Sequence, residues 1–107
     1  MKIYIAGKIT GDPDYRVKFA QAELEIARKG HVPVNPAQVL GEEGWTWEDF
    51  MRETGILQSK CAASYFLPDW TESRGARLEH EKALRESQVV YYDINAIPGR
   101  TGLEDAG

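Results

Sequence analysis

Cysteine is nearly absent from this chain, whose 107 residues include only Cys61. A single thiol cannot form an intramolecular disulfide or supply the paired cysteines of a zinc cluster. The composition therefore favours a reducing compartment, and we expect neither a metal nor an organic cofactor. Cys61 itself is predicted to be a small, buried apolar residue, because nothing near it in the sequence indicates an activated thiol.

Long hydrophobic runs are also missing. No stretch approaches the roughly 18 apolar residues of a membrane span. The apolar start, from Met1 to Gly7, is too short for the hydrophobic region of a signal peptide. We therefore expect a cytoplasmic protein that does not contact a membrane.

Positive charge is neither abundant nor clustered. Thirteen lysines and arginines against seventeen aspartates and glutamates give a net charge of −4. A groove that follows the phosphates of long DNA or RNA needs a basic cluster, so a small-molecule ligand is favoured. The length allows one core, and we predict one domain over residues 1–93. Residues 94–107 are predicted to be a tail that has little to bury and is mobile.

The remaining pattern alternates between strands and helices. It predicts strands at residues 2–6, 31–36, 62–67 and 88–92, a loop at 37–46, and helices over 12–30, 47–60 and 73–87. Pro33 has no backbone donor, which places the second strand at a sheet edge. Such alternation implies parallel pairing with right-handed crossovers. We predict the α/β class, a three-layer open parallel sheet of four to five strands, Rossmann- or flavodoxin-like.

One apolar stripe is predicted on the first helix. Its residues recur at spacings of three and four, which places them on one face: Val17, Ala20, Leu24 and Ala27. We expect this stripe to pack on the sheet.

The strongest local signal for a site is the segment Ser73-Arg-Gly-Ala-Arg-Leu-Glu79. Ser73 lies at a helix start, where the unpaired backbone N–H groups of Gly75 and Ala76 could bind an anion. Glu79 lies four residues after Gly75, on the same face and about one turn deeper. The alternative is an ordinary N-cap serine followed by a solvated glutamate.

A glycine-bounded loop, Gly7-Lys8-Ile9-Thr10-Gly11, follows the first predicted strand. It belongs to the carboxyl edge of the sheet, as does the segment from Pro68 to Gly75, and ligands of such folds bind at that edge. The loop matches neither a Walker A motif nor the dinucleotide-binding fingerprint. It is either a ligand contact or a plain turn.

Three tryptophans, Trp45, Trp47 and Trp70, occur in or beside predicted loops. Each is either a stacking surface for a base or a cover over the core.

Further acids near the expected site are Asp49, Glu53 and Asp69, each of which is either a second carboxylate of the site or simply solvated. His80 follows Glu79 but points about 100° away around the helix, so it is not favoured as a base.

The three motifs occur together in a known superfamily. The opening Ile3–Gly11, the turn Phe66–Trp70 and the pattern Ser73-x-Gly-x-x-x-Glu79 together resemble the nucleoside 2-deoxyribosyltransferase-like superfamily. The resemblance is to its small, often phage-associated branch of the DUF4406 type, and it covers residues 1 to about 92. Its specificity lies in the order and separation of the motifs.

The resemblance implies an activity. In the deoxyribosyltransferases and the related 2′-deoxynucleoside 5′-phosphate N-hydrolases, the glutamate matched by Glu79 attacks the anomeric carbon and forms a glycosyl-enzyme. Ser73 and Gly75 would then contact the 5′-phosphate, and Tyr4 would lie near the ribose. The 7–11 loop would hold phosphate and sugar, and Trp70 or Trp47 would stack on the base. A homodimer or larger homo-oligomer is also implied.

Two positions depart from the family pattern. Thr54 stands where these enzymes have an aspartate, and Ala62 replaces an acid that commonly precedes the central strand. Retaining glycosidic cleavage normally uses two carboxyl groups about 5 to 5.5 Å apart. Two functions therefore stay open. One is cleavage or base exchange at the N-glycosidic bond of a (deoxy)ribonucleoside 5′-monophosphate, and the other is a catalytically inactive module that senses or sequesters a nucleotide.

Overall fold

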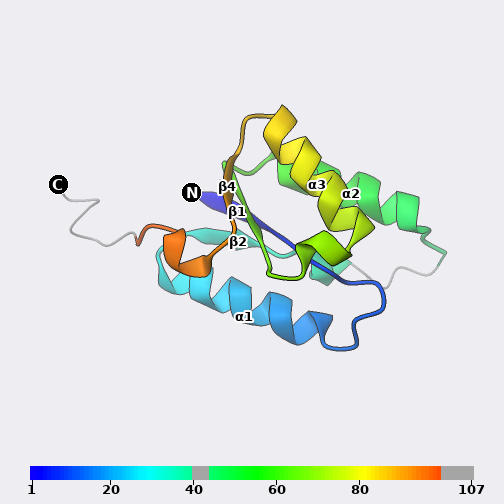
Figure 1. Cartoon of the computed structure of the whole chain (residues 1–107), viewed down its shortest axis with the longest axis horizontal. Coiled ribbons are helices and arrows are strands. Elements are labelled where there is room, and N and C mark those ends of the chain that lie inside the picture. The colour runs from blue at the N-terminus through cyan, green and yellow to red at the C-terminus, as the bar shows by residue number, and fades with distance from the viewer. Residues whose placement is uncertain (40–43, 100–107) are drawn as a thin grey trace.

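The computed structural model describes residues 1–39 and 44–99 of the chain. Four parallel strands form a sheet in the order β2-β1-β3-β4 (Figure 1). Their bounds are Lys2–Ala6 for β1, Val32–Val34 for β2, Ala63–Phe66 for β3 and Val89–Tyr91 for β4. The predicted parallel α/β sheet is confirmed, and Pro33 lies in the edge strand β2, as expected.

Helices cover both faces of the sheet. The helix α1 (Tyr15–Arg28) lies on one face, and α2 (Trp47–Ser59) and α3 (Arg74–Arg85) lie side by side on the other (Figure 1). This arrangement is the predicted three-layer architecture. Short 3-10 turns at Pro36–Val39, Trp70–Glu72 and Ile94–Ala96 complete the described chain. The first of them occupies part of the predicted 37–46 loop, and residues 40–43 of that loop lie outside the described residues.

The strand order creates a crevice beside β1. The chain leaves β1 toward β2 on one side and later returns to pair β3 on the other, so the crossovers diverge at the carboxyl ends of β1 and β3. Pairing extends beyond the strands, because the Leu67 N–H donates to the Ala6 carbonyl at 2.8 Å. A Cβ at Gly7 would lie 2.6 Å from Leu67 Cδ1, so a larger residue here would displace the Leu67 side chain.

The core is divided by the sheet. Because side chains alternate along a strand, Ile3 and Ile5 of β1 face α1, whereas Tyr4 and Ala6 face α2 and α3. All four are fully buried. Cys61 is buried on the second side, which confirms its predicted role as a small apolar residue.

The prediction for the α1 stripe is wrong. The four expected core residues of that stripe are exposed, and the buried face is formed by Phe19, Ala22 and Ile26. Both sets have helical spacing, so periodicity alone cannot decide which one faces the sheet. The larger Phe19 and Ile26 occupy the core and leave Val17 and Leu24 outside.

The start of the predicted tail is packed against the domain. Ile97 is only 1% exposed and belongs to the α1-side core, contrary to the expectation that this segment has little to bury. Lys29 Nζ donates to the Ile97 carbonyl at 3.2 Å, and His31 Nε2 lies 2.6 Å from the Pro98 carbonyl oxygen. Residues 100–107 of the tail lie outside the described residues.

Candidate functional site

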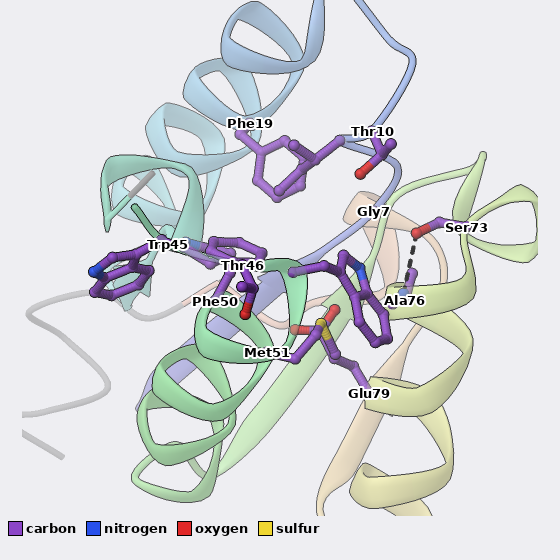
Figure 2. A pocket seen from close by; sticks show the side chains of 14 residues that line it. Gly7, Thr10, Phe19, Trp45, Thr46, Phe50, Met51, Ser73, Ala76 and Glu79 are labelled. Carbon is purple, nitrogen blue, oxygen red and sulfur yellow. Dashed lines mark hydrogen bonds between the residues drawn. The ribbon is translucent and has the colours of Figure 1, made fainter. Parts of the chain in front are cut away.

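A cavity of about 260 Å³ opens at the carboxyl edge of the sheet, in the crevice beside β1. Figure 2 shows Phe19 from α1, Met51 from α2 and Glu79 from α3 converging on it. The lining is mostly apolar or aromatic, with a few polar groups among it: Gly7, Ile9, Thr10, Phe19, Pro36, Trp45, Thr46, Trp47, Phe50, Met51, Ser73, Gly75, Ala76 and Glu79.

Glu79 is the chemically distinctive residue of this cavity. It is 7% exposed, and the Tyr4 hydroxyl donates a hydrogen bond to its Oε2. Burial raises the pKa of Glu79 to about 7, while the hydrogen bond from Tyr4 acts in the opposite direction. Burial, with the charge of Glu79, also raises the pKa of Tyr4 well above its usual value. At neutral pH the carboxyl group is therefore balanced between its protonated and ionised forms.

The start of α3 places Glu79 below the rim of the cavity. Ser73 is the N-cap, and its Oγ accepts a hydrogen bond from the Ala76 N–H at 3.1 Å, which confirms the predicted cap. The expectation that the Ala76 N–H is unpaired is wrong, because the capping hydroxyl already accepts from it. A Cβ at Gly75 would lie 3.1 Å from Met51 Sδ, so glycine lets α2 and α3 approach closely here. Ser73, Gly75 and Glu79 thus meet at one cavity, as expected, and anion binding there stays a prediction.

The start of α2 forms the opposite rim and engages Asp49. Thr46 Oγ1 accepts from the Asp49 N–H at 3.1 Å, and the Asp49 carboxylate accepts from the Thr46 N–H at 3.0 Å. These bonds lower the pKa of Asp49. This capping box positions Thr46 and Trp47 at the cavity. Asp49 itself does not line it.

The other two candidate acids are also outside the cavity lining. Glu53 is exposed on α2. Asp69 accepts from the Lys8 N–H at 3.1 Å and pairs with Lys18, which also pairs with Asp12. This contact ties the loop after β1 to the turn after β3. Among the described residues that line the cavity, Glu79 alone carries a carboxyl group.

The glycine-bounded loop contributes part of its length to the site. Gly7, Ile9 and Thr10 line the cavity, whereas Lys8 and Gly11 do not. Gly11 has a φ of +81°, which glycine adopts without strain, so its role is to form the turn after this loop. The Lys8 N–H is already bonded to Asp69.

The tryptophans separate into two groups. Trp45 and Trp47 line the cavity. Trp70 lies in another cluster, where its ring centroid is 5.4 Å from that of Phe66 and 4.3 Å from that of His80. His80 Nε2 in turn lies 2.7 Å from the Tyr92 hydroxyl. The structure does not bring the Trp70 indole or His80 into the cavity.

Sequence reasoning missed Arg74, the first residue of α3. Its guanidinium carbon lies 4.4 Å from the centroid of the Trp47 ring, within cation–π range. Both residues line a second hollow that adjoins the cavity, with Thr10, Glu72, Ser73 and Gly75. Arg74 lies within the segment 73–79 that was predicted to bind an anion, and its positive charge there was the signal that could have identified it.

Thr54, the position that departs from the enzyme pattern, is fully buried in α2. Its hydroxyl donates to the Phe50 carbonyl at 3.0 Å, and it lies beside the Tyr4 hydroxyl. The departure therefore falls next to the Tyr4–Glu79 pair. Within residues 1–39 and 44–99, no group of three or more His, Cys, Asp or Glu residues is placed to hold a metal ion. No described helix is long and apolar enough to cross a membrane.

The open parallel sheet with helices on both faces places this chain in the three-layer α/β class, and its cavity lies at the carboxyl edge of the sheet, where the crossovers diverge. More specifically, the chain belongs to the DUF4406 family, described as a domain of unknown function, whose model matches residues 1–92. No curated protein matches the chain. The DUF4406 part of the resemblance is confirmed, and the link to nucleoside 2-deoxyribosyltransferase-like enzymes stays a prediction.

Proposed function

We propose that the cavity binds a nucleoside 5′-monophosphate and that Glu79 cleaves its N-glycosidic bond as the nucleophile. The observation that carries this proposal is a buried carboxyl group, held by Tyr4, at a cavity with aromatic walls. A carboxylate in such surroundings has an altered pKa, which is a common property of reacting groups.

The side chains around the cavity support separate positions for the base, the sugar and the phosphate of the nucleotide. Trp45, Trp47 and Phe50 offer flat apolar surfaces that suit a nucleobase. The sugar would then lie toward Tyr4 and Glu79. The phosphate would lie toward the start of α3 and the Arg74 guanidinium, the positive group of the adjoining hollow.

The proposed reaction uses Glu79 in its ionised form. A carboxylate oxygen attacks the anomeric carbon, and the base leaves with the bonding electron pair and takes up a proton from solvent water. Water, or a second base, then displaces the glutamate from the glycosyl-enzyme. Because Glu79 has a pKa of about 7, the fraction that can attack increases as the pH rises through neutrality.

A second candidate function is nucleotide binding without turnover. It is favoured by the observation that Glu79 is the one carboxyl group among the described lining residues, while Asp49 and Asp69 are engaged elsewhere. Retaining cleavage normally uses two carboxyl groups. A sensing or sequestering role would need the same cavity but no second acid.

Base release by the native protein separates the two candidates, and the variant Glu79→Gln tests the role of the glutamate. Nucleosides and their 5′-monophosphates are screened by thermal shift, with chromatographic detection of free base in each sample. We expect the native protein to be stabilised by a monophosphate and to release base faster as the pH rises through 7. The variant should bind within a few-fold and release none.

Stabilisation of the native protein without base release would favour the binding module, and full activity in Glu79→Gln would eliminate the mechanism. A homodimeric or larger assembly and a cytoplasmic location, both expected from the sequence, belong to the same proposal. Light scattering of the purified protein tests the first of these.

A further inference from the structure

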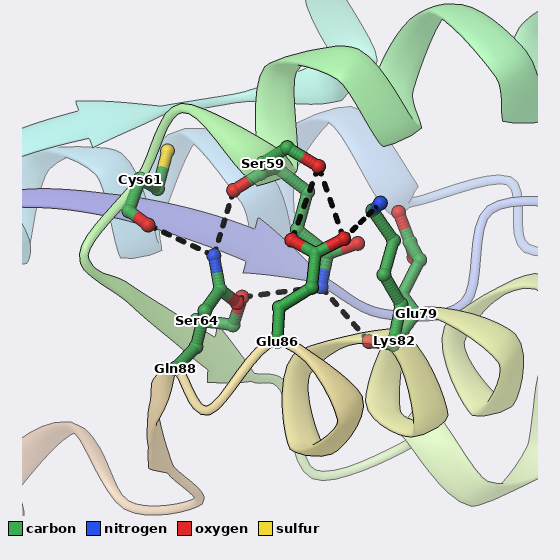
Figure 3. Close-up of polar contacts among 8 residues, drawn as sticks. Ser59, Cys61, Ser64, Glu79, Lys82, Glu86 and Gln88 are labelled. Carbon is green, nitrogen blue, oxygen red and sulfur yellow. Dashed lines mark hydrogen bonds and ion pairs between the residues drawn. The ribbon is translucent and has the colours of Figure 1, made fainter.

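Beneath Glu79, the contact between α2 and α3 contains a buried polar network. Gln58 of α2 is fully buried, and its Nε2 donates to the Glu79 main-chain carbonyl at 2.8 Å and to Ser64 Oγ at 3.3 Å. The Ser64 hydroxyl donates to Gln88 Oε1 at 2.6 Å. Figure 3 shows Gln88 reaching toward Ser64 and Cys61. The network thus joins α2, the central strand β3 and α3.

Gln88 anchors the other end of this network. Its Nε2 donates to the main-chain carbonyls of Gln58 at 2.7 Å and Cys61 at 2.9 Å. The residue before it, Ser87, has a φ of 57°, in the left-handed region that residues other than glycine rarely adopt. This turn directs the chain from α3 into β4. These contacts tie the end of α2 to the turn before β4, and none of them reaches Glu79.

The bond from Gln58 to Glu79 is not needed to form the helix. Carbonyls inside an α-helix already accept from the N–H four residues later, and Glu79 lies within α3. In addition, Gln58 Oε1 is buried and has no hydrogen-bond partner among the described residues. An unpartnered buried oxygen costs stability. An apolar side chain of similar length would fill the same space without that cost.

We propose that Gln58 is a positioning residue for Glu79. Its amide holds the turn of α3 that carries Glu79 against α2, and this contact sets the carboxyl group at hydrogen-bonding distance from the Tyr4 hydroxyl on β1. Calling Glu79 the reacting group rests on the function proposed above. The positioning itself rests only on the contacts of Gln58.

The test measures the titration of the Glu79 carboxyl group by carbon NMR, with its signal assigned through Glu79→Gln. In Gln58→Met, the turn of α3 that carries Glu79 loses its hydrogen bond to α2, while the bond from Ser59 of α2 to Glu86 still holds the far end of α3. The bond from Tyr4 to Glu79 should then weaken. Tyr4 lowers the pKa of Glu79, so the midpoint should move upward, by about half a unit or more. Tyr4 on β1 is the titratable group that faces this carboxyl, and α2 presents the uncharged Thr54. If base release occurs, kcat should fall about tenfold with little change in KM.

Gln88→Met is the matched control, because Gln88 belongs to the same network but does not contact Glu79. It should lower the melting temperature at least as much as Gln58→Met and leave the Glu79 midpoint unchanged. Gln58→Asn, which retracts the amide by one methylene, should move the midpoint in the same direction as Gln58→Met. An unchanged midpoint in both Gln58 variants, or an equal shift in Gln88→Met, would overturn the proposal. The titration needs no substrate, so it can succeed even if no nucleotide is cleaved.

Discussion

The two faces of the sheet contain different kinds of residue, although the same strands supply both. Toward α1, the core is formed mainly by aliphatic and aromatic side chains such as Ile3, Ile5, Phe19 and Ile26. Toward α2 and α3, the buried residues include polar groups from four elements: Tyr4, Thr54, Gln58, Ser64 and Glu79. Apolar burial stabilises a fold, whereas burial of a carboxyl group opposes it. The α1 face is therefore the more apolar of the two, and the other face carries Glu79 and its polar partners.

The largest effect is expected on the apolar face. Ile26→Ala should lower the free energy of unfolding by about 3 to 4 kcal/mol, because it leaves a cavity beneath α1. Ile26 is fully buried, whereas Leu24 on the same helix is 51% exposed. Leu24→Ala is therefore the matched control and should change stability by less than about 0.5 kcal/mol. Urea unfolding of both variants checks this, and similar losses in the two would contradict the observed orientation of α1.

On the polar face, by contrast, we expect a substitution that raises the free energy of unfolding. The pKa of Glu79 is raised from 4.5 to about 7, so between these values the folded state holds a proton that the unfolded chain has released. Stability should thus fall as the pH rises through this window, by a total of about 3 kcal/mol. Glu79→Gln removes the ionisation and should be more stable than the native protein by up to that amount above pH 8.

Urea unfolding of both proteins between pH 4 and 8 measures this difference. The two curves should converge below about pH 4.5, where the carboxyl group is protonated in both the folded and the unfolded chain. A constant gap across the range would mean that ionisation of Glu79 is not the cause.

The smallest effect is expected at the turn that leads from α3 into β4. Ser87 has a left-handed backbone with a φ of 57°, which glycine adopts without strain. Ser87→Gly should raise the free energy of unfolding by about 0.5 to 1 kcal/mol and leave the Glu79 titration unchanged. Ala20→Gly, at an exposed position in the middle of α1, should instead destabilise the protein by about 1 kcal/mol, which controls for a general effect of glycine. A loss of stability in Ser87→Gly would show that the serine side chain contributes more than the backbone costs.

Local signals in the sequence predicted much of the fold. Ser73 caps α3 as expected, because a capping side chain and its partner N–H lie within one turn of chain. Pro33 lies at an edge, because it has no donor to give to a second neighbour. The position of Glu79 below Ser73 and Gly75 also follows from helical periodicity.

Some features could not be predicted because two local patterns fit equally well or because the deciding contact comes from a distant part of the chain. Two apolar stripes share α1, and only packing against the sheet selects the one with Phe19 and Ile26. Ile97 joins the core although its neighbours in the sequence resemble a loop. Asp69 is an acid near the site, but Lys8 and Lys18 from distant segments bind its carboxylate. The capping box of Thr46 and Asp49, by contrast, is a local pattern that sequence reasoning missed.

The sequence alone determined the order of strands and helices, the parallel sheet they imply, and the helix turn that sets Glu79 beneath the start of α3. These features depend on interactions within a few residues or on a repeating pattern of apolar side chains. The tertiary structure decided that Tyr4 meets Glu79, that Gln58 holds it from below, and that Trp47 rather than Trp70 lines the cavity. Each of these contacts joins residues on different elements, whose relative depth is set by packing on the sheet and leaves no local signature in the chain.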